Sequence, residues 1–149
     1  MSPYRVRYGS MFDDQAYQTR TCTVNCVGVM GAGIALEFKK RYPELYRRYR
    51  LDCQHGYVLP GMALRYQVDN QSILCFATKD HWRNPTELGW VTSGLDALVR
   101  AGDTIGITSL SLAPLGCGHG GLTIEAVEPL IRAAAGRLPY PVELVLGKP

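Results

Sequence analysis

Apolar residues recur along this chain in two patterns: short continuous or alternating runs, and longer stretches with a spacing of about three to four residues. The first pattern is typical of β-strands and the second of amphipathic helices. With the glycines and prolines between them, these runs predict about six strands and about four helices. We expect strands at residues 4–8, 21–27, 63–68, 72–78, 104–113 and 141–146, and helices at 32–41, 43–54, 86–100 and 123–138.

The order of these elements predicts an α/β fold in three layers, with a mixed sheet between helices. Residues 72–78 are almost wholly apolar, so we expect a central strand covered on both faces. Residues 69–71 separate this strand from the preceding one and predict a hairpin. Nothing resembles a linker or a repeat, so we interpret residues 1–149 as a single domain, either a complete small protein or one domain of a longer chain.

The composition is that of an ordinary globular protein, since 46% of the 149 residues are hydrophobic and 19% are charged. No apolar run approaches the roughly 20 residues that a membrane span needs, and the amino terminus has no hydrophobic signal segment. We therefore expect a cytoplasmic protein without membrane association. We also expect a monomer, although the sequence does not determine the oligomeric state.

The five cysteines and three histidines are spread along the chain. Without a Cys-x-x-Cys pair, the sequence predicts no zinc site and no other metal site. Most of the cysteines lie in expected strands or helices and are interpreted as reduced packing residues. Cys117 lies in a glycine loop close to His119, where it is either a packing residue or a reactive thiol.

The most distinctive segment follows the second expected strand, where Gly28, Gly31 and Gly33 precede a helix. Glycines at such a point let main-chain N–H groups approach an anion, and the helix amino terminus adds partial positive charge. Their order differs from the Gly-x-Gly-x-x-Gly of dinucleotide-binding folds, and no acidic residue follows at the ribose-binding spacing. The segment therefore argues against a nicotinamide or flavin enzyme.

A second glycine-rich loop, residues 114–122, also lies between an expected strand and an expected helix. Two anion-binding edges suit a diphosphate better than a single phosphate. The amide of Asn25, at the start of the first loop, can bind a sugar hydroxyl, and Lys79 follows the central strand, at the edge where open α/β sheets bind ligands. The alternative is that the glycines serve tight turns only.

Positive charge is concentrated in the first two expected helices. The net charge is +3, and six cations lie between Lys39 and Arg50. These cations either form a solvated helix face or follow a phosphate backbone. Leu45 and the tyrosines around it have helical spacing, which indicates a core stripe rather than a base-stacking platform.

Three separated motifs carry a resemblance to one family. Val24–Ala35, Thr78–Arg83 and Pro114–Leu122, in this order, are similar to macrodomains, and within them to the branch of the DarG antitoxin and the animal terminal ADP-ribose protein glycohydrolase. The resemblance implies a three-layer α/β/α fold that binds ADP-ribose across the two loops. It also implies that Lys79 is catalytic, because a lysine stands at the matching position in that branch.

The same resemblance implies the residues that bind ADP-ribose. In the first loop, which would hold the distal ribose, they are Asn25, Val29, Met30, Gly31, Ala32, Gly33 and Ile34. In the second loop, which would enclose the diphosphate, they are Leu115, Gly116, Cys117, Gly118, His119, Gly120, Gly121 and Leu122.

The chain departs from this branch in two places. The second loop has no carboxylate before Glu125, whereas the animal relative carries a catalytic aspartate there. His119 lies in this loop and is either a second catalytic residue, acting as acid or base, or a contact for phosphate or water. The turn after the first strand lacks the acidic or amide residue that reads adenine, for which Asp13 or Asp14 is the substitute candidate.

The leading hypothesis is an ADP-ribosyl hydrolase that removes ADP-ribose from thymidine in single-stranded DNA, through Lys79 and without a cofactor. Trp82, Arg83, Arg47 and Arg48 are the candidate contacts with the DNA strand. The alternative for Trp82 is buried structural support. A cognate ADP-ribosyltransferase toxin is the expected protein partner.

Two alternatives remain open at this point. The first is a non-catalytic module that binds ADP-ribose, in which turnover has no dependence on Lys79. The second is a hydrolase of another ADP-ribose compound: a modified protein carboxylate, ADP-ribose phosphate or acetyl-ADP-ribose. Only His119 favours the last two substrates.

Overall fold

The computed structural model describes residues 3–13 and 16–147. The strands in these residues are β1 (Tyr4–Tyr8), β2 (Thr19–Val24), β3 (Ala63–Val68), β4 (Gln71–Ala77), β5 (Leu110–Leu112) and β6 (Val142–Leu146). The helices are α1 (Gly33–Arg41), α2 (Pro43–Gln54), α3 (Leu88–Ala101) and α4 (Ile124–Ala135), and Gly118–Gly120 form one turn of 3-10 helix, η1. The predicted order of strands and helices is confirmed.

All the described strands form one mixed sheet. Their order is β1-β6-β5-β2-β4-β3, and every neighbouring pair is parallel except the antiparallel pair of β3 and β4. The predicted hairpin joins that antiparallel pair through Asp69 and Asn70, whose φ angles of 49° and 61° lie in the left-handed region that a tight two-residue turn requires.

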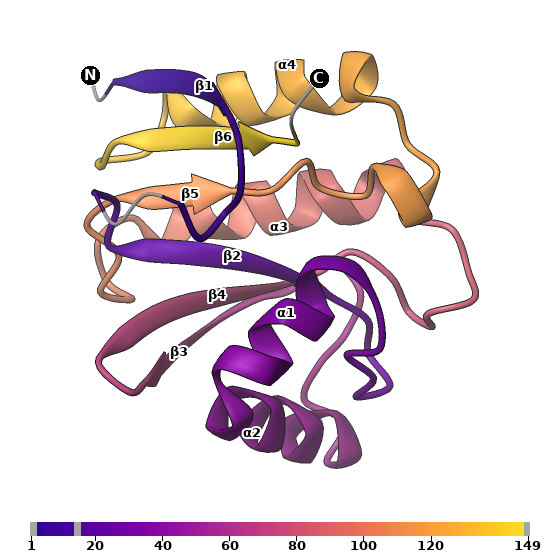
Figure 1. Ribbon diagram of the computed structural model, residues 1–149. Helices are drawn as coiled ribbons and strands as arrows, with labels where there is room; N and C mark the ends of the chain where they lie inside the picture. The colour runs from indigo at the N-terminus through magenta and orange to yellow at the C-terminus, as the bar shows by residue number, and fades with distance from the viewer. Residues whose placement is uncertain (1–2, 14–15, 148–149) are drawn as a thin grey trace.

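The sheet lies between two helical layers, with α1 and α2 on one face and α3 and α4 on the other (Figure 1). The side chains of β4 alternate between the layers: Leu74 and Phe76 join the core under α3 and α4, and Ile73 and Cys75 join the core under α1 and α2. All four are fully buried, which confirms the prediction of a central strand covered on both faces. The three-layer α/β/α prediction is therefore correct.

The α1 and α2 layer covers the half of the sheet that contains β2, β4 and β3 (Figure 1). On the same face of β6, the carboxylate of Glu143 is buried and bound by two arginines and a serine. Arg5 Nη2 and Arg7 Nε donate to Glu143 Oε1 at 2.9 and 3.2 Å, and Ser111 Oγ donates to Oε2 at 2.6 Å. The other half of the sheet, which contains β1, β6 and β5, is thus held by an ion-pair network as well as by apolar contacts.

Two predicted strands are wrong in their boundaries. The strand expected at 104–113 is confined to β5, because Gly106 has a φ of +82° and the side chain of Gln18 binds the backbone of Gly106 and Thr108. The strand expected at 21–27 is β2 instead, which begins earlier because Thr19 and Arg20 pair with β4 and β5. It ends at Val24 because the side chain of Asn25 turns the backbone that follows.

None of the helices in residues 3–13 and 16–147 is both long enough and apolar enough to cross a bilayer.

Candidate functional site

The three motifs singled out in the sequence meet at one edge of the sheet. The first glycine loop follows β2, the segment with Lys79 follows β4, and the second glycine loop follows β5, and these strands are neighbours in the order β5-β2-β4. The chain after β2 enters α1 on one face, whereas the chains after β4 and β5 lead to α3 and α4 on the other (Figure 1). Such a divergence at carboxyl ends of parallel strands leaves a crevice between the loops.

A cavity of about 780 Å³ occupies this crevice. It is lined by the first loop and the start of α1, by the segment after β4, and by the second loop as far as η1: Thr23, Val24, Asn25, Val29, Gly31, Ala32, Gly33, Ile34, Ala35, Thr78, Lys79, Trp82, Arg83, Ala113, Pro114, Gly116, Cys117, Gly118, His119 and Gly120. The volume lies in the range of about 300–1,000 Å³ typical of sites for small molecules and nucleotides. Lysine and arginine are present in this lining and aspartate and glutamate are absent, so the cavity suits an anion.

Asn25 organises the first loop with its side-chain amide. Its Oδ1 accepts hydrogen bonds from the amides of Val27 and Val29 at 3.1 and 3.3 Å, and its Nδ2 donates to the carbonyl of Val29 at 2.8 Å. The hydroxyl of Tyr49 donates to Oδ1 at 2.9 Å from α2. One Nδ2 hydrogen remains for a ligand, so the predicted contact of Asn25 with a sugar hydroxyl stays a prediction, beside a structural role that the sequence analysis missed.

The start of α1 presents unpaired main-chain donors to the cavity. No side chain among the described residues caps this terminus, and no acidic residue lies in its first turn. Gly31, Ala32, Gly33 and Ile34 all line the cavity, where the amides of a helix amino terminus are available to an anion. Met30 differs from its neighbours, because its side chain is buried in the core under α1 and α2.

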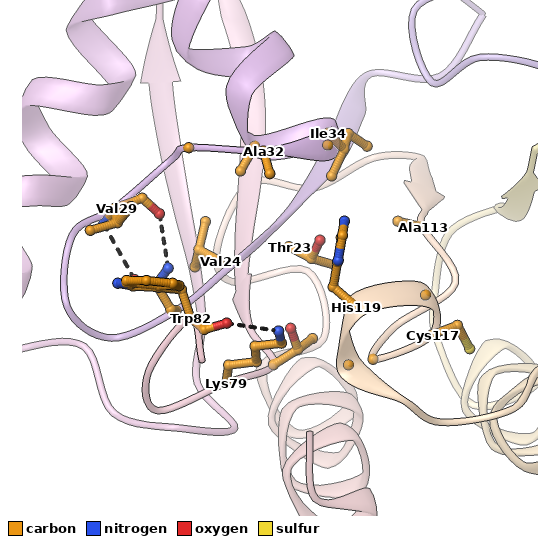
Figure 2. A pocket seen from close by; sticks show the side chains of 18 of the residues that line it. Thr23, Val24, Val29, Ala32, Ile34, Lys79, Trp82, Ala113, Cys117 and His119 are labelled. Carbon is orange, nitrogen blue, oxygen red and sulfur yellow. Dashed lines mark hydrogen bonds between the residues drawn. The ribbon is translucent and has the colours of Figure 1, made fainter. Parts of the chain in front are cut away.

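Lys79 lies in a loop that several hydrogen bonds define. Its Nζ donates to the carbonyl of Trp82 at 3.2 Å (Figure 2). The carboxylate of Asp80 accepts from the amide of His81 at 2.7 Å and from Nδ2 of Asn84 at 3.1 Å. The hydrogen bond from Asn84 holds the pKa of Asp80 below 3.8, assisted by the one from the His81 amide. The side chain of Lys79, which is partly exposed, is thus placed by a turn in which Asp80 stays anionic around neutral pH.

Cys26 joins the first loop to this lysine loop. Its amide donates to the carbonyl of Asp80 at 3.2 Å, and its Sγ donates to the carbonyl of Lys79 at 3.3 Å. Burial raises the pKa of the Cys26 thiol to about 12. The thiol is therefore a neutral donor that ties the two loops together.

Trp82 and Arg83 stand at the cavity as an exposed pair. The guanidinium of Arg83 lies 4.6 Å from the centre of the Trp82 ring, and the ring of His81 lies 5.2 Å from it. Trp82 is 46% exposed, so the alternative of buried structural support is wrong. An exposed aromatic face beside a cation can stack on a planar group at the mouth of the cavity.

The second loop presents another set of main-chain donors. The amides of Gly118, His119 and Gly120 make no hydrogen bond to a residue in the described part of the chain. Successive free N–H groups in such a turn form a concave site for an anion. His119 is exposed on this turn and lines the cavity, with its ring visible beside Thr23 and Ile34 in the view of Figure 2.

Some residues expected in the second loop lie outside the lining. Leu115 is fully buried, and Gly121 and Leu122 lie beyond the part of the loop that lines the cavity. The thiol of Cys117 donates to the carbonyl of Leu115 at 3.9 Å, and burial raises its pKa. These features support the interpretation of Cys117 as a packing residue, and the contacts expected for the other three stay predictions.

Thr86 packs against the second loop, a contact that the sequence analysis did not predict. Its amide donates to the carbonyl of Gly120 at 2.9 Å. A Cβ on Gly120 would lie 2.4 Å from Thr86 Oγ1, and one on Gly116 would lie 2.7 Å from Thr86 Cγ2. The glycines therefore permit close packing on Thr86, a contact that local sequence does not reveal.

The remaining candidates lie away from this cavity. Arg47 and Arg48 are on α2 and both pair with Glu44. Asp13 accepts a hydrogen bond from the amide of Ser10 at 2.8 Å, and Asp14 lies outside the described residues. In residues 3–13 and 16–147, no three histidine, cysteine, aspartate or glutamate side chains are grouped as metal ligands.

Comparisons of the sequence identify relatives. The family model described as Macro domain matches residues 22–131. The DNA ADP-ribosyl glycohydrolase of Mycobacterium tuberculosis is 45% identical over 121 residues, which cover 78% of this chain and 34% of the relative. That of Thermus aquaticus is 40% identical over 116 residues, which cover 75% and 32%. A DNA ADP-ribosyl transferase-DNA ADP-ribosyl glycohydrolase fusion protein of Thermosipho africanus is 33% identical and matched over 93% of this chain and 40% of its own.

Solved structures have the same fold. The macrodomain of Thermus aquaticus DarG superposes with a TM-score of 0.89 and 33% identity over 98% of this chain and 99% of its own. The macrodomain of Mycobacterium tuberculosis DarG gives 0.86 and 37% over 97% of both chains. Thermosipho africanus DarTG in complex with ADP-ribose gives 0.86 and 34% over 93% of this chain and 40% of its own.

The chain spans about a third of the length of the first two curated relatives. The family match covers most of the chain, from β2 to the middle of α4, and therefore includes all three loops of the cavity. On sequence and structure together, this chain belongs to the macrodomain family.

Proposed function

We propose that this protein is an ADP-ribosyl glycohydrolase that releases ADP-ribose from modified DNA, with thymidine in single-stranded DNA as the favoured acceptor. The observation that carries the proposal is the meeting of Lys79 with two amide-rich turns in one cavity that is free of acidic side chains. The names of the Mycobacterium tuberculosis and Thermus aquaticus relatives support the same activity.

ADP-ribose fits this arrangement in one orientation. Its diphosphate would accept hydrogen bonds from the free amides of η1 and from the start of α1. The distal ribose would then lie beside Asn25 and Lys79, which brings its anomeric carbon towards the ammonium. The Thermosipho africanus structure with bound ADP-ribose supports this ligand.

The reaction consumes one water, breaks the bond between the anomeric carbon and the base, and yields ADP-ribose and the unmodified base. Lys79 can contribute in two ways. As a neutral amine it would attack the anomeric carbon and expel the base, and water would then hydrolyse the Schiff base. As an ammonium it would stabilise the departing base without a covalent bond. Borohydride added during turnover separates these routes, because only the first leaves ADP-ribose fixed to Lys79.

His119, on the second glycine loop, would either transfer a proton or bind the diphosphate. Its exposure in the cavity lining suits proton transfer to the leaving base or to water, and equally a hydrogen bond to phosphate. A pH profile of kcat that loses one limb in His119→Gln supports proton transfer. An unchanged profile with weaker ADP-ribose binding supports the phosphate contact.

The surroundings of the cavity supply the contacts with DNA. Trp82 would stack on a base next to the modified one, with Arg83 on its phosphate, and the expected contribution of Arg47 and Arg48 is electrostatic. We further propose that the protein is a cytoplasmic monomer and reverses the modification made by a cognate ADP-ribosyltransferase. The fusion of both activities in the Thermosipho africanus relative supports this pairing.

The test is incubation of the wild type and Lys79→Ala with a single-stranded oligonucleotide that carries ADP-ribose on thymidine, with released ADP-ribose followed by mass spectrometry. We expect release by the wild type and a loss of about 100-fold or more in the variant. Calorimetry with free ADP-ribose serves as the control, since the variant should still bind. No release by either protein, with ADP-ribose bound by both, would favour a binding module or another ester substrate.

A further inference from the structure

The outer side of the first glycine loop rests on Arg50 of α2. Gly28 is buried and has a φ of +82°, and a Cβ there would lie 3.3 Å from Cγ and 3.6 Å from Cα of Arg50. The aliphatic part of Arg50 is therefore packed against the loop, whereas the residue as a whole is exposed. Arg50 thus places its charge beside the loop, outside the cavity.

Arg50 differs from Arg47 and Arg48 on α2 because its guanidinium pairs with no residue in the described ranges 3–13 and 16–147. Arg47 and Arg48 both pair with Glu44, and Arg48 Nη1 also donates to the carbonyl of Gln67 at 2.9 Å. The side chain of Arg50 makes no hydrogen bond or ion pair with any residue that the structure describes. A partner with negative charge would therefore gain more from Arg50 than from the two paired arginines.

A second hollow, of about 370 Å³, adjoins Arg50 on the outer side of α2. It is lined by Tyr46, Arg47, Arg50, Leu51 and Gln54, so it combines an aromatic ring, an aliphatic side chain and two arginines, of which Arg47 is already paired with Glu44. Stacking surfaces next to cations are the combination with which proteins bind single-stranded nucleic acid.

The first loop connects this hollow with the mouth of the cavity. On one side, the amide of Cys26 is bonded to Asp80 of the lysine loop, two residues before Trp82. On the other side, Gly28 touches Arg50. Val27 lies between these contacts and Val29 directly follows Gly28, and their side chains are 46% and 40% exposed, so the loop presents two apolar side chains to solvent. The side chains of Val29 and Trp82 lie on the same side of the cavity in Figure 2.

We propose that Arg50 and the hollow beside it bind the single strand next to the modified nucleotide, with the guanidinium on a backbone phosphate and a base in the hollow. The strand would run from Trp82 across Val27 and Val29 to Arg50. This inference rests on the proposed function, since it takes the ADP-ribosylated nucleotide to occupy the cavity. It assigns a substrate-positioning role to a residue outside the catalytic cavity.

Two variants at one position separate the charge of Arg50 from its packing. Arg50→Met keeps an unbranched chain against Gly28 and removes the charge, and Arg50→Lys keeps both. Release of ADP-ribose is measured from two substrates, an internally modified single-stranded oligonucleotide and the ADP-ribosylated nucleoside alone. Arg137→Gln, an exposed arginine after α4, is the control for net charge.

We expect Arg50→Met to lower kcat/KM for the oligonucleotide by about five- to tenfold, mainly through KM, and to leave the nucleoside unchanged. The salt dependence for the oligonucleotide should become shallower by about 0.7 in logarithmic slope, the amount for one phosphate contact with a single strand. Arg50→Lys should regain most of the loss, and Arg137→Gln should match the wild type. Equal loss on both substrates, or no loss on either, overturns the inference.

A binding measurement keeps this test independent of catalysis. Fluorescence anisotropy with an unmodified single-stranded oligonucleotide is recorded at several salt concentrations for the wild type, Arg50→Met and Arg137→Gln. A weaker and less salt-dependent interaction in Arg50→Met alone supports the strand path, even where the wild type releases no ADP-ribose and the proposed activity has failed. Identical titrations for all three proteins overturn the path.

Discussion

The side chain of Asn25 holds the backbone in place where β2 ends and the first glycine loop begins. Its Oδ1 accepts from two amides of the loop and from Tyr49, and its Nδ2 donates to a carbonyl of the same loop. Burial raises the pKa of Tyr49 well above its usual range, so this hydroxyl remains a donor. The asparagine therefore shapes this wall of the cavity through its side-chain hydrogen bonds.

Asn25→Asp tests this structural task with a nearly isosteric change. The second carboxylate oxygen would face the carbonyl of Val29, which Nδ2 approaches to 2.8 Å, and would replace attraction by repulsion. We expect the free energy of unfolding to fall by about 1–3 kcal/mol and ADP-ribose binding to weaken. Urea denaturation and calorimetry measure both, and Asn70→Asp in the β3–β4 turn is the matched control. Unfolding like the wild type would contradict the role.

Gly120→Ala tests the packing of the second loop. The added methyl carbon would lie 2.4 Å from Thr86 Oγ1 and 3.2 Å from its Cβ, so the turn with the free amides must move. We expect ADP-ribose affinity to fall by about tenfold or more, because misplaced donors lose their hydrogen bonds to the ligand. Calorimetry with ADP-ribose measures the effect.

Two further variants identify the cause of that loss. Gly89→Ala, at a position with open space around the new methyl group, should leave affinity unchanged. Thr86→Ala combined with Gly120→Ala removes the nearest atom and should restore part of the affinity. An equal loss in the single and double variants would mean that the clash with Thr86 is not the cause.

Some residues of the site could be predicted from the sequence and others could not. The loop glycines and Lys79 could be selected from the sequence because each follows a predicted strand. Thr86 could not, because its importance comes from contact with glycines about thirty residues away that only the folded chain brings near. Trp82 was undecided between burial and exposure for the same reason, since exposure depends on its neighbours in space.

At the scale of elements, the turn after β4 places Lys79 through hydrogen bonds that belong to other residues. Asp80 accepts from the amide of His81 and from Asn84, which closes the turn. Lys79 Nζ is bonded to the carbonyl of Trp82 within the same turn. The geometry of the lysine therefore depends on Asp80.

Asp80→Ala removes the acceptor that closes this turn. We expect kcat for release of ADP-ribose to fall by about tenfold, because the ammonium loses its fixed position, while the Kd for free ADP-ribose changes little. Asp96→Ala, on the exposed side of α3, is the control and should behave as the wild type. A parallel loss of binding and turnover would show that Asp80 instead supports the whole cavity.

The predicted elements were most accurate where periodicity is long and least accurate where side chains satisfy the backbone. The helices α1 and α2 have nearly the expected bounds, because their apolar stripes and Pro43 mark them. The segment 104–109 is rich in β-forming residues, yet Gln18 binds its backbone from a distant part of the chain. Strand propensity depends on nearby residues only, so it does not predict a hydrogen-bond partner about 90 residues away in the sequence.

At the scale of the molecule, the site exists because β4, β2 and β5 are neighbours in the sheet. The sequence predicts three loops that follow strands, and the resemblance to macrodomains predicts that the loops share one ligand. The order of the strands does not follow from their apolar patterns alone, because most of them are parallel and similarly buried. Long-range pairing therefore had to come from the family resemblance.

The half of the sheet that contains β1, β6 and β5 is stabilised by a buried ion-pair network as well as by apolar packing. Glu143 of β6 is fully buried, and its hydrogen bonds with Arg5 and Arg7 join it to β1, and that with Ser111 to β5. Burial alone would raise the pKa of Glu143, but the hydrogen bonds from Arg7, Ser111 and Arg5 outweigh it and hold the pKa below 4.5. The ionised carboxylate is thus favoured in the folded state relative to the unfolded chain.

This pKa shift predicts how stability depends on pH. Because the folded pKa is the lower one, the contribution of Glu143 is complete well above pH 4.5 and is lost as the pH falls below 4.5 through the folded pKa. Glu143→Gln should lower the free energy of unfolding by about 3 kcal/mol at pH 7, because it removes the buried negative charge with which Arg5 and Arg7 pair. Urea denaturation at pH 7, 5, 4 and 3 should show this difference narrowing at the acidic end, with Asp103→Asn as the control. A difference that stays constant down to pH 3 would mean that ionisation of Glu143 does not stabilise the sheet.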